Sequence, residues 1–295
     1  MDSALVERVR RFNRTVTQRV GALDDAFLSR ARPLGQARVL WEIGADGCEI
    51  RSLRSRLDLD SGYLSRLLRA LEADGLVTVD ADDTDGRVRT ARLTEAGLAE
   101  RAELNQRSDD LAASILRPLT KHQRDRLVEA MAEVERLLVA SLVHVDPVDP
   151  SHPHARHCIR AYYTELAQRF DNGFDPTRAL PTDDEVLRPP TGLFLLATLH
   201  AEPVGCGALK FHRDGVAEIK RVWVAPTVRG LGLGRRLLTE LEDRARAHGS
   251  VALRLDTNSA LKEAVALYRS TGYGEVAAFN DEPYAHHWFE KRLAS

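Results

Sequence analysis

The 295-residue chain lacks most features that would place it in a specialised class of protein. Its three cysteines, Cys48, Cys158 and Cys206, stand far apart and form no C-x-x-C pair. Such cysteines are typical of a reducing compartment and predict neither a disulfide framework nor a structural zinc site. No apolar run reaches the roughly 18 residues of a membrane-spanning helix, and the N-terminus has no signal-peptide core. We therefore expect a cytoplasmic protein that does not contact a membrane.

The chain also lacks an excess of charge of one sign. Its 42 Lys+Arg and 44 Asp+Glu give a net charge of −2. Neither half is basic, with 23 basic against 24 acidic residues up to position 145 and 19 against 20 beyond it. This balance argues against a generally polycationic nucleic-acid binder but permits a local basic patch. Nearly all basic residues are arginine, which suits contacts with phosphate and guanine, although genome composition explains that bias equally well.

The length fits two domains of about 140 residues each, and a hydrophobic content of 43% can fill two cores. Prolines at 147, 150 and 153 predict an extended, semi-rigid segment between them. We place a first domain at 1–143, a Pro/His-rich linker at 144–156 and a second domain at 157–295. The linker histidines have no regular ligand spacing, so we expect solvated side chains there and no metal.

The most informative stretch runs from Val216 to Leu238. Residues 218–224 are rich in β-branched and aromatic side chains, as strands are, and Pro226 ends the run. A glycine-rich turn, R-G-L-G-L-G at 229–234, follows and opens onto leucines at helical spacing. Free N–H groups at a helix N-terminus form an anion site that suits phosphate. Alone, such a turn also occurs between packed elements that bind no ligand.

This order of strand, R-x-x-G-x-G turn and helix resembles motif A of the GNAT-family acetyltransferases, a pattern that Arg229, Gly232 and Gly234 fill. The resemblance implies acetyl-CoA as cosubstrate, with its pyrophosphate in the turn and its pantetheine arm beside the strand. The turn lacks the ribose-binding acid of a dinucleotide fold and the Lys-Ser/Thr pair of a Walker loop. The implied cofactor contacts are Val222, Trp223, Val224, Arg229, Gly230, Leu231, Gly232, Leu233, Gly234, Arg235, Asn258 and Tyr268.

A second stretch, L-D-T-N-S-A-L-K-E-A-V-A-L-Y at 255–268, supports this resemblance. In the family, an Asn after the fifth strand contacts the pantetheine arm or the cofactor-binding helix, and here that is Asn258. A Tyr on the next helix lies near the thioester sulfur, and here that is Tyr268. An N-capping Asn and a core Tyr are the structural alternatives. The resemblance covers 157–295 and implies an α+β acyltransferase fold with a mixed, mainly antiparallel sheet.

Amide formation sets the chemistry that such a domain needs. A protonated alkylamine must lose a proton before it attacks a thioester, and a sheltered carboxylate with a raised pKa can take it. Glu218 is the candidate base, since family histone acetyltransferases place their glutamate at the same offset before the turn. An ion pair with a neighbouring basic residue is the alternative. Tyr268 is the candidate acid for the departing thiolate, and the Val224 N–H is the candidate oxyanion donor.

The N-terminal half predicts a helix-turn-helix. Residues 4–30 place apolar side chains on one face of a long amphipathic helix, and 37–43 predict a second helix. Ile50, Leu53 and Leu57 predict a short helix, followed by a three-residue connection with Asp60 as N-cap. The next helix leaves side chains outward that suit major-groove contacts, although a solvated basic face is the alternative. These outward residues are Ser61, Tyr63, Ser65, Arg66 and Arg69.

Two strand-like runs, 76–79 and 88–93, flank a polar loop and complete a winged helix. Arg87 and Arg89 at its tip suit minor-groove or phosphate contacts, although three aspartates of the same loop would be repelled by DNA. The run D-S-G-Y-L-S-R-L-L-R-A-L-E-A-D-G-L-V, the D-G-R of the wing and R-L-T-E-A-G at 92–97 together resemble the MarR family of regulators. That family implies a mostly-α homodimer, clasped by its first and last helices on a pseudo-palindromic site in double-stranded DNA.

Apolar residues from 127 to 142 predict a last amphipathic helix, whose stripe is covered either by a dimer partner or by the second domain. The whole sequence favours a bifunctional protein, a transcriptional regulator joined to an N-acetyltransferase that acts on an amine of a small molecule or protein. In a second hypothesis the GNAT-like domain senses acetyl-CoA or a small ligand without catalysis. In a third, the winged helix binds protein rather than DNA.

Overall fold

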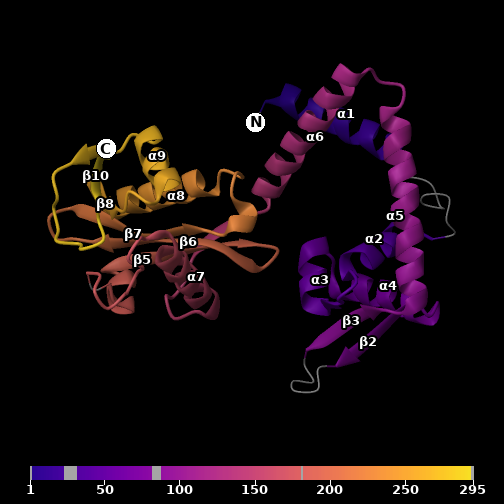
Figure 1. Cartoon of the computed structure of the whole chain (residues 1–295), viewed down its shortest axis with the longest axis horizontal. Helices are drawn as coiled ribbons and strands as arrows, with labels where there is room; N and C mark the ends of the chain where they lie inside the picture. Colours follow the sequence, from indigo (N-terminus) through magenta and orange to yellow (C-terminus); the bar gives the residue numbers. More distant parts are fainter. Residues whose placement is uncertain (1, 23–31, 82–87, 181, 294–295) are drawn as a thin grey trace. The chain divides into compact units, whose positions relative to one another are not determined.

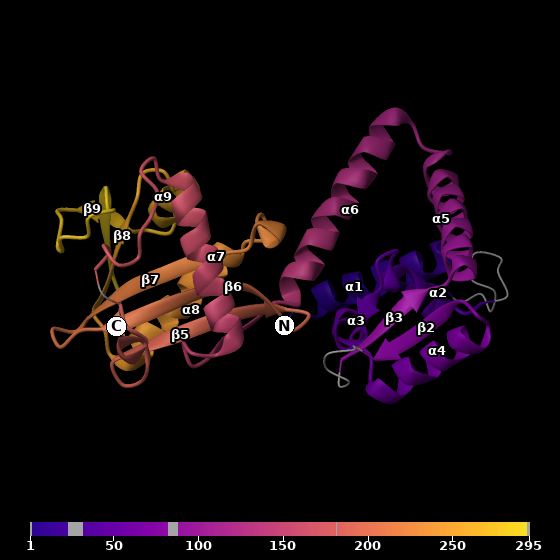
Figure 2. The same ribbon diagram turned by 60° about the horizontal axis from the view of Figure 1, so that its bottom comes forward.

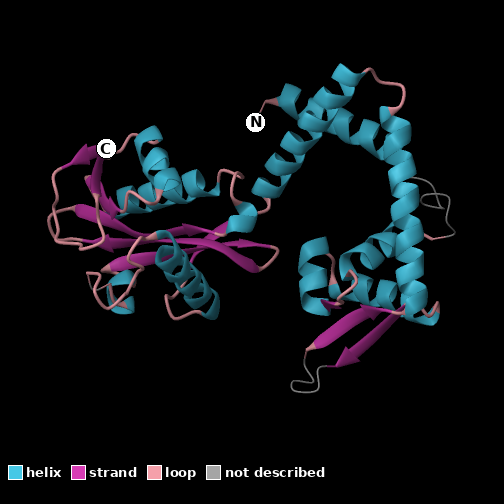
Figure 3. Cartoon of the chain, viewed as in Figure 1, coloured by secondary structure: helices cyan, strands magenta, loops and turns pink. Residues whose placement is uncertain are grey.

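The computed structural model describes residues 2–22, 32–81, 88–180 and 182–293. The chain divides into two compact units, Met1–Ala132 and Glu133–Ser295 (Figure 1). The first unit is mainly helical with a small sheet, and the second is built on a broad sheet with helices on both faces (Figure 3). The boundary falls inside α6 (Lys121–Ser141), before the end of the first domain placed at 143 from the sequence.

In the first unit, short helices pack against a three-stranded antiparallel sheet of order β1-β3-β2. Its elements are α1 (Ser3–Arg19), α2 (Leu34–Ile43), β1 (Cys48–Glu49), α3 (Ile50–Leu57), α4 (Ser61–Ala73), β2 (Val77–Ala81), β3 (Arg89–Leu93), α5 (Glu95–Leu116) and α6 (Lys121–Ser141). The side chain of Asp60 accepts a hydrogen bond from the Tyr63 N–H at 2.9 Å, which starts α4 as predicted. The helix-turn-helix and the strands of the wing are therefore confirmed.

The core of this unit comes from the stripe of leucines that the sequence placed inward. Leu64 and Leu71 of α4 are at most 1% exposed, and they pack with Leu40, Leu53 and Leu104. Helix α4 therefore has one face of buried leucines and an opposite face whose side chains are exposed to solvent.

The first helix is shorter than the predicted 4–30, because α1 ends at Arg19 and Gly21 has a positive φ of 65°. Residues 23–31, which include two positions of the predicted stripe, lie outside the described residues. Large apolar side chains of α1 and α6, among them Leu5, Val9 and Met131, are more than half exposed. A homodimer that covers them stays a prediction.

The second unit is a seven-stranded sheet of order β4-β5-β6-β7-β8-β10-β9. Every neighbouring pair is antiparallel except β7 and β8, which run parallel. Its elements are β4 (His144–Pro147), α7 (Pro153–Arg169), the 3-10 helices η2 (Asp184–Leu187) and η3 (Pro226–Val228), β5 (Gly192–Leu199), β6 (Glu202–Phe211), β7 (Val216–Val224), α8 (Leu233–His248), β8 (Ala252–Thr257), α9 (Lys262–Ser270), β9 (Gly274–Val276) and β10 (His287–Arg292). Helices α7 and α8 lie on opposite faces of the sheet (Figure 2). The mixed, mainly antiparallel sheet agrees with the prediction.

The predicted linker at 144–156 is wrong. Residues 144–147 form the edge strand β4, paired with β5 from His144↔Thr198 to Pro147↔Leu195. Helix α7 begins at Pro153, with His152 as its N-cap accepting from the His154 N–H. Proline is tolerated at the end of an edge strand and in the first turn of a helix, so its density did not require an unfolded segment.

Strand β7 departs from regular pairing with both of its neighbours. Its pairing with β8 stops after Glu218↔Arg254, so 219–224 separate from β8. Its register with β6 also shifts between Cys206↔Trp223 and Ala208↔Lys220, which sets two β7 residues against Gly207. One of them, Arg221, has a φ of 55°, in the left-handed region that non-glycine residues rarely adopt. This bulge and the parting of the strands open the sheet at its centre.

Candidate functional site

The glycine-rich turn joins β7 to α8 and leaves the N-terminus of that helix accessible. Gly230 and Gly232 have φ angles of 83° and 79°, which only glycine adopts without strain. Gly232 is the N-cap residue of α8, so no side chain at that position competes for the first N–H groups. A Cβ on Gly234 would lie 3.1 Å from a methyl group of Leu267, so this glycine lets α9 approach α8 closely. These features favour a phosphate-bearing ligand at the turn.

A cavity of about 510 Å³ lies in front of this turn. Most of the predicted cofactor contacts line it, namely Val222, Trp223, Val224, Arg229, Gly230, Gly232, Leu233, Gly234, Arg235 and Tyr268. Leu231 and Asn258 do not. Its long, largely apolar wall along β7 and its amide-rich end at α8 suit a ligand with a flexible chain and a phosphate group.

Asn258 lines an adjoining cavity rather than this one. It is 8% exposed, its Nδ2 donates to the carbonyl of Tyr284 at 2.7 Å, and its Oδ1 accepts from the Ala260 N–H at 2.8 Å. These bonds tie the β8–α9 loop to the C-terminal segment. Asn258 does not have the N-capping role weighed from sequence, because the N-cap residue of α9 is Leu261. A contact with the cofactor stays a prediction.

The side chain of Arg229 is held against the protein. Its Nε donates to the Val224 carbonyl at 3.1 Å, and its guanidinium pairs with Glu165 of α7. Glu165 also accepts from the indole N–H of Trp223 at 2.9 Å. Arg136 of α6 donates to the carbonyl of Gly230 at 2.7 Å. The sequence pattern gave no signal for Glu165 or Arg136, because both reach the turn from distant helices.

A second cavity, of about 400 Å³, adjoins the first. The two share the lining residues Tyr162, Leu166, Val222, Leu261, Ala264 and Tyr268. Part of the second cavity's wall comes from the loop between α7 and β5, including Phe174 and Leu180.

Tyr268 stands where the two cavities meet. It is 6% exposed, and its burial, helped by the nearby carboxylate of Asp256, holds the pKa of its hydroxyl well above the usual value. The phenol therefore keeps its proton at neutral pH and is available as a donor. Burial raises the pKa of Tyr162, beside it, in the same direction.

Glu218 does not have the environment expected of a base. Burial by itself raises the pKa of its carboxyl, but the charges of Lys220 at 2.8 Å and His212 at 3.3 Å outweigh burial and lower it. Glu218 is 7% exposed and lines neither cavity. The expectation of a raised pKa is wrong, and the alternative of an ion pair on the strand is what the structure contains.

Asp256, which the sequence analysis passed over, lines the second cavity. Lys220 bridges it to Glu218, with its Nζ 2.7 Å from Asp256 and 2.8 Å from Glu218. Burial lowers the pKa of Lys220, but the two carboxylates outweigh it and raise that pKa. Asp256 therefore lies on the cavity wall beside Tyr268 as part of a buried group of paired charges. Asp256 stands two residues before Asn258 in the stretch 255–268, and this position was the only indication in the sequence of a role in the site.

The proposed DNA-reading face is solvent-exposed in the first unit. Ser61, Tyr63, Ser65, Arg66 and Arg69 all point outward from α4, and the guanidinium of Arg66 lies 5.6 Å from the centre of the Tyr63 ring. Arg89 is exposed on β3, whereas Arg87 falls outside the described residues. Within the described ranges, we find no group of three or more His, Cys, Asp or Glu that could hold a metal ion. No described helix is both long and apolar enough to span a membrane.

Comparisons with known proteins divide the chain in the same way. The sequence profile of the acetyltransferase (GNAT) family matches 159–273, and that of the MarR family matches 28–88. An IAA acetyltransferase of Azospirillum brasilense is 42% identical over 103 residues, covering 35% of this chain and 66% of that protein. An uncharacterized N-acetyltransferase of Schizosaccharomyces pombe is 37% identical over 112 residues, with the same coverage of 35% and 66%. The chain thus spans just under two thirds of the length of these relatives.

Among solved structures, a GNAT-family acetyltransferase from Staphylococcus aureus aligns with a TM-score of 0.45 and 17% identity, over 52% of this chain and 99% of that one. Each profile matches the unit whose residues resemble that family, and the matched ranges contain both the helix-turn-helix and the glycine-rich turn. The chain is therefore a fusion of a MarR-family region with a GNAT-family acetyltransferase region.

Proposed function

We propose that the protein is a transcriptional regulator that also transfers an acetyl group from acetyl-CoA to an amine. The observation that carries the enzymatic part is the meeting of two cavities at Tyr268, one ending at the glycine-rich turn and one open to a second substrate. A thioester and an amine must meet at one point, and adjoining cavities provide it. The exposed arginines of α4 support the regulatory part.

The residues fit acetyl-CoA in the first cavity. The N–H groups at the start of α8 would hold the pyrophosphate, and the edge of β7 released from β8 would run beside the pantetheine arm. In the reaction, the protonated amine first gives one proton to a base, its nitrogen bonds to the acetyl carbon and the carbon–sulfur bond breaks; the second proton that the nitrogen loses replaces the one that Tyr268 donates. Tyr268 would give its proton to the departing thiolate, and the Val224 N–H would stabilise the oxyanion.

Two carboxylates compete to take the proton of the amine. Glu218 was expected from the offset to the turn, but its charge is engaged by Lys220 and His212. Asp256 reaches the wall of the second cavity and belongs to the same group of paired charges. We propose that Asp256 faces the amine, with Glu218 fixing Lys220 behind it.

Release of CoA from acetyl-CoA, measured over a panel of small amines, peptides and proteins, tests the proposal. The relative from Azospirillum brasilense is named an IAA acetyltransferase, so IAA belongs in the panel. We expect CoA release with at least one acceptor. Tight binding of acetyl-CoA without turnover of any acceptor would instead support a domain that only senses the cofactor.

Gly232→Ala is expected to raise the Kd for acetyl-CoA about tenfold, because an alanine in the left-handed region costs roughly 1–2 kcal/mol and turns the first N–H groups of α8 away. The matched control is Gly249→Ala at the other end of the same helix. Gly249 also has a positive φ, 90°, and open space around it. Calorimetry should find normal cofactor affinity in Gly249→Ala. If both variants lose the same affinity for acetyl-CoA, the cause is a less stable domain and not the conformation of the turn.

Arg66→Ala is expected to weaken binding to the protein's own upstream DNA about tenfold, the usual effect of losing one arginine contact to base or phosphate. Arg117→Ala is the control, since Arg117 is also exposed in the first unit but lies at the end of α5. Fluorescence anisotropy at fixed salt measures both. Intact protein that does not bind this DNA would contradict the regulator and favour a winged helix that binds protein.

A further inference from the structure

We propose that the acceptor carries a carboxylate close to its amine, together with an apolar or aromatic side group, and that Arg221 binds this carboxylate in the 400 Å³ cavity. The inference rests on the proposed acetyl transfer and names the chemical class of its second substrate. The cavity is of a size that suits a small molecule such as an amino acid.

The bulge of β7 aims Arg221 into the cavity. Side chains of a regular strand alternate between the two faces of a sheet, so consecutive residues cannot line one cavity. Here four consecutive residues, 219–222, line it. The register shift opposite Gly207 and the positive φ of Arg221 produce this departure. A strained backbone at an arginine persists only where the surrounding structure enforces it, and such positions cluster at ligand sites.

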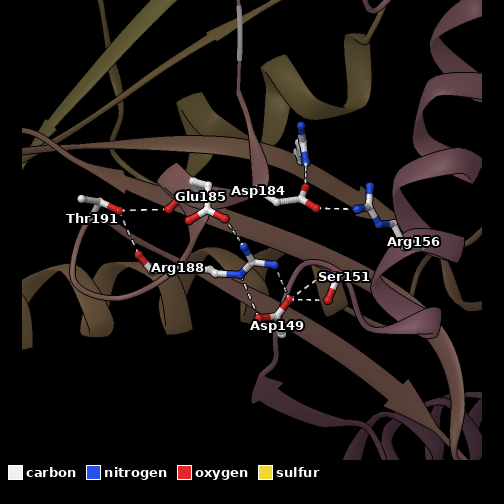
Figure 4. A network of polar contacts seen from close by, with 8 residues as sticks. Asp149, Ser151, Arg156, Asp184, Glu185, Arg188 and Thr191 are labelled. Carbon is white, nitrogen blue, oxygen red and sulfur yellow. Dashed lines mark hydrogen bonds and ion pairs between the residues drawn. The ribbon is translucent and has the colours of Figure 1, made fainter.

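The guanidinium of Arg221 has donors to spare. Its side chain is only 12% exposed, and within the described residues it makes one hydrogen bond, to the carbonyl of Thr182. Asp184 forms an ion pair with Arg221 at 3.9 Å, which is longer than a hydrogen bond, and a closer one with Arg156 at 2.6 Å (Figure 4). A guanidinium has five N–H donors, and two arginines share one carboxylate here. The guanidinium of Arg221 therefore has N–H donors free for the carboxylate of a ligand.

The other charged groups of the cavity wall are already satisfied or exposed. Glu282 accepts from the backbone N–H groups of Leu180 and Tyr284. Lys220 is neutralised by Asp256 and Glu218, and Glu218 is also paired with His212. Asp183 is exposed to solvent. The cavity therefore has a carboxylate at the Asp256 end and a guanidinium with free donors at the Arg221 end. A molecule with an amine and a carboxylate complements both ends, with its amine at Tyr268.

Aromatic rings form the remaining wall and favour an apolar side group. Phe170, Phe174 and Tyr284 contact one another with ring centres 4.9–5.9 Å apart. Tyr163 stands 5.4 Å from Phe174, and the guanidinium of Arg221 lies 5.9 Å from its ring centre. Clustered aromatic faces bind flat or branched apolar groups, while the guanidinium at their edge provides the polar contact.

The test compares two ligands that differ only in the carboxylate, N-acetylphenylalanine and N-acetylphenethylamine, by calorimetry in the presence of CoA. Wild-type protein should bind the carboxylate ligand at least tenfold more tightly, as a charge-assisted bidentate pair implies. Arg221→Gln should abolish that preference. Arg213→Gln, an exposed arginine of the β6–β7 turn, should keep it. Equal affinities in the wild type, or a preference that survives Arg221→Gln, would overturn the proposal. The wild-type comparison stands even where the variant folds poorly.

Turnover of phenylalanine and of phenethylamine separates this inference from the proposed function. A wild type that prefers the carboxylate ligand but releases no CoA contradicts acetyl transfer and leaves the anion site in place. A wild type that acetylates phenethylamine and discriminates against phenylalanine supports acetyl transfer and overturns the carboxylate site. We expect phenylalanine to be the better substrate. Arg221→Gln should lower kcat/KM for phenylalanine and leave kcat/KM for phenethylamine unchanged, which would support both acetyl transfer and the carboxylate site.

Discussion

Tyr268→Phe is expected to slow the release of CoA from acetyl-CoA about 100-fold, the lower end of what a positioned general acid contributes. The hydroxyl stands where the two cavities meet, and its raised pKa keeps the proton that the thiolate needs. Phenylalanine retains the ring, whose contact with Phe289 at 5.9 Å belongs to the core. The Kd for acetyl-CoA should therefore stay close to that of the wild type while kcat falls.

Tyr273→Phe is the matched control for this prediction. Tyr273 is also buried, and its hydroxyl donates to Glu242 at 3.2 Å, but it lines neither cavity. Its loss should lower Tm and leave kcat nearly unchanged. A Tyr268→Phe variant with wild-type kcat would mean that this tyrosine is only a core residue, the structural alternative raised from sequence.

Asp256→Asn is expected to slow acetyl transfer about 100-fold as well, because the amine then lacks a base at the cavity wall. Glu218→Gln should cost about tenfold, since it removes a partner of Lys220 and leaves the wall intact. The deficit of Asp256→Asn should shrink as the pH approaches about 10, where an alkylamine is largely deprotonated in solution. Initial rates between pH 7 and pH 10 measure this recovery.

Glu202→Gln, an exposed position on β6, controls for the general loss of a carboxylate in these measurements. If Glu218→Gln lowers the rate of acetyl transfer more than Asp256→Asn does, then Glu218 is the base, as the sequence first suggested. A loss in Asp256→Asn that is independent of pH would give Asp256 a role in positioning Lys220 rather than in proton transfer.

The spacing of apolar residues along the chain predicted most of the helices and strands. The leucines of α4 were assigned correctly because helical spacing sorts a buried face from an exposed one. Errors came where one composition fits two structures, as with the prolines of β4 and α7, or where a periodic pattern outruns its helix, as in α1 beyond Arg19. Both are decided by neighbours in space that a single segment does not reveal.

In the site, too, the residues of a local motif were predicted from sequence, whereas those that depend on distant elements were not. The glycine-rich turn was identified because its R-x-x-G-x-G spacing between a strand and a helix resembles motif A, and most of its residues line one cavity. Glu218 was assigned from an offset alone, and the offset carries no information about Lys220 and His212 beside it. Asp256 and Glu165 were missed because their roles depend on strands and helices far apart in sequence.

The sequence by itself determined that the chain has a winged helix followed by an acyltransferase fold, and that a glycine-rich turn opens α8. These follow from spacing along the chain, which fixes local conformation. Only the tertiary structure decided which carboxylate reaches the second cavity, what pKa Glu218 has, and that Arg221 turns into the cavity at a bulge. Charge and strain depend on distances between strands, which local conformation does not fix.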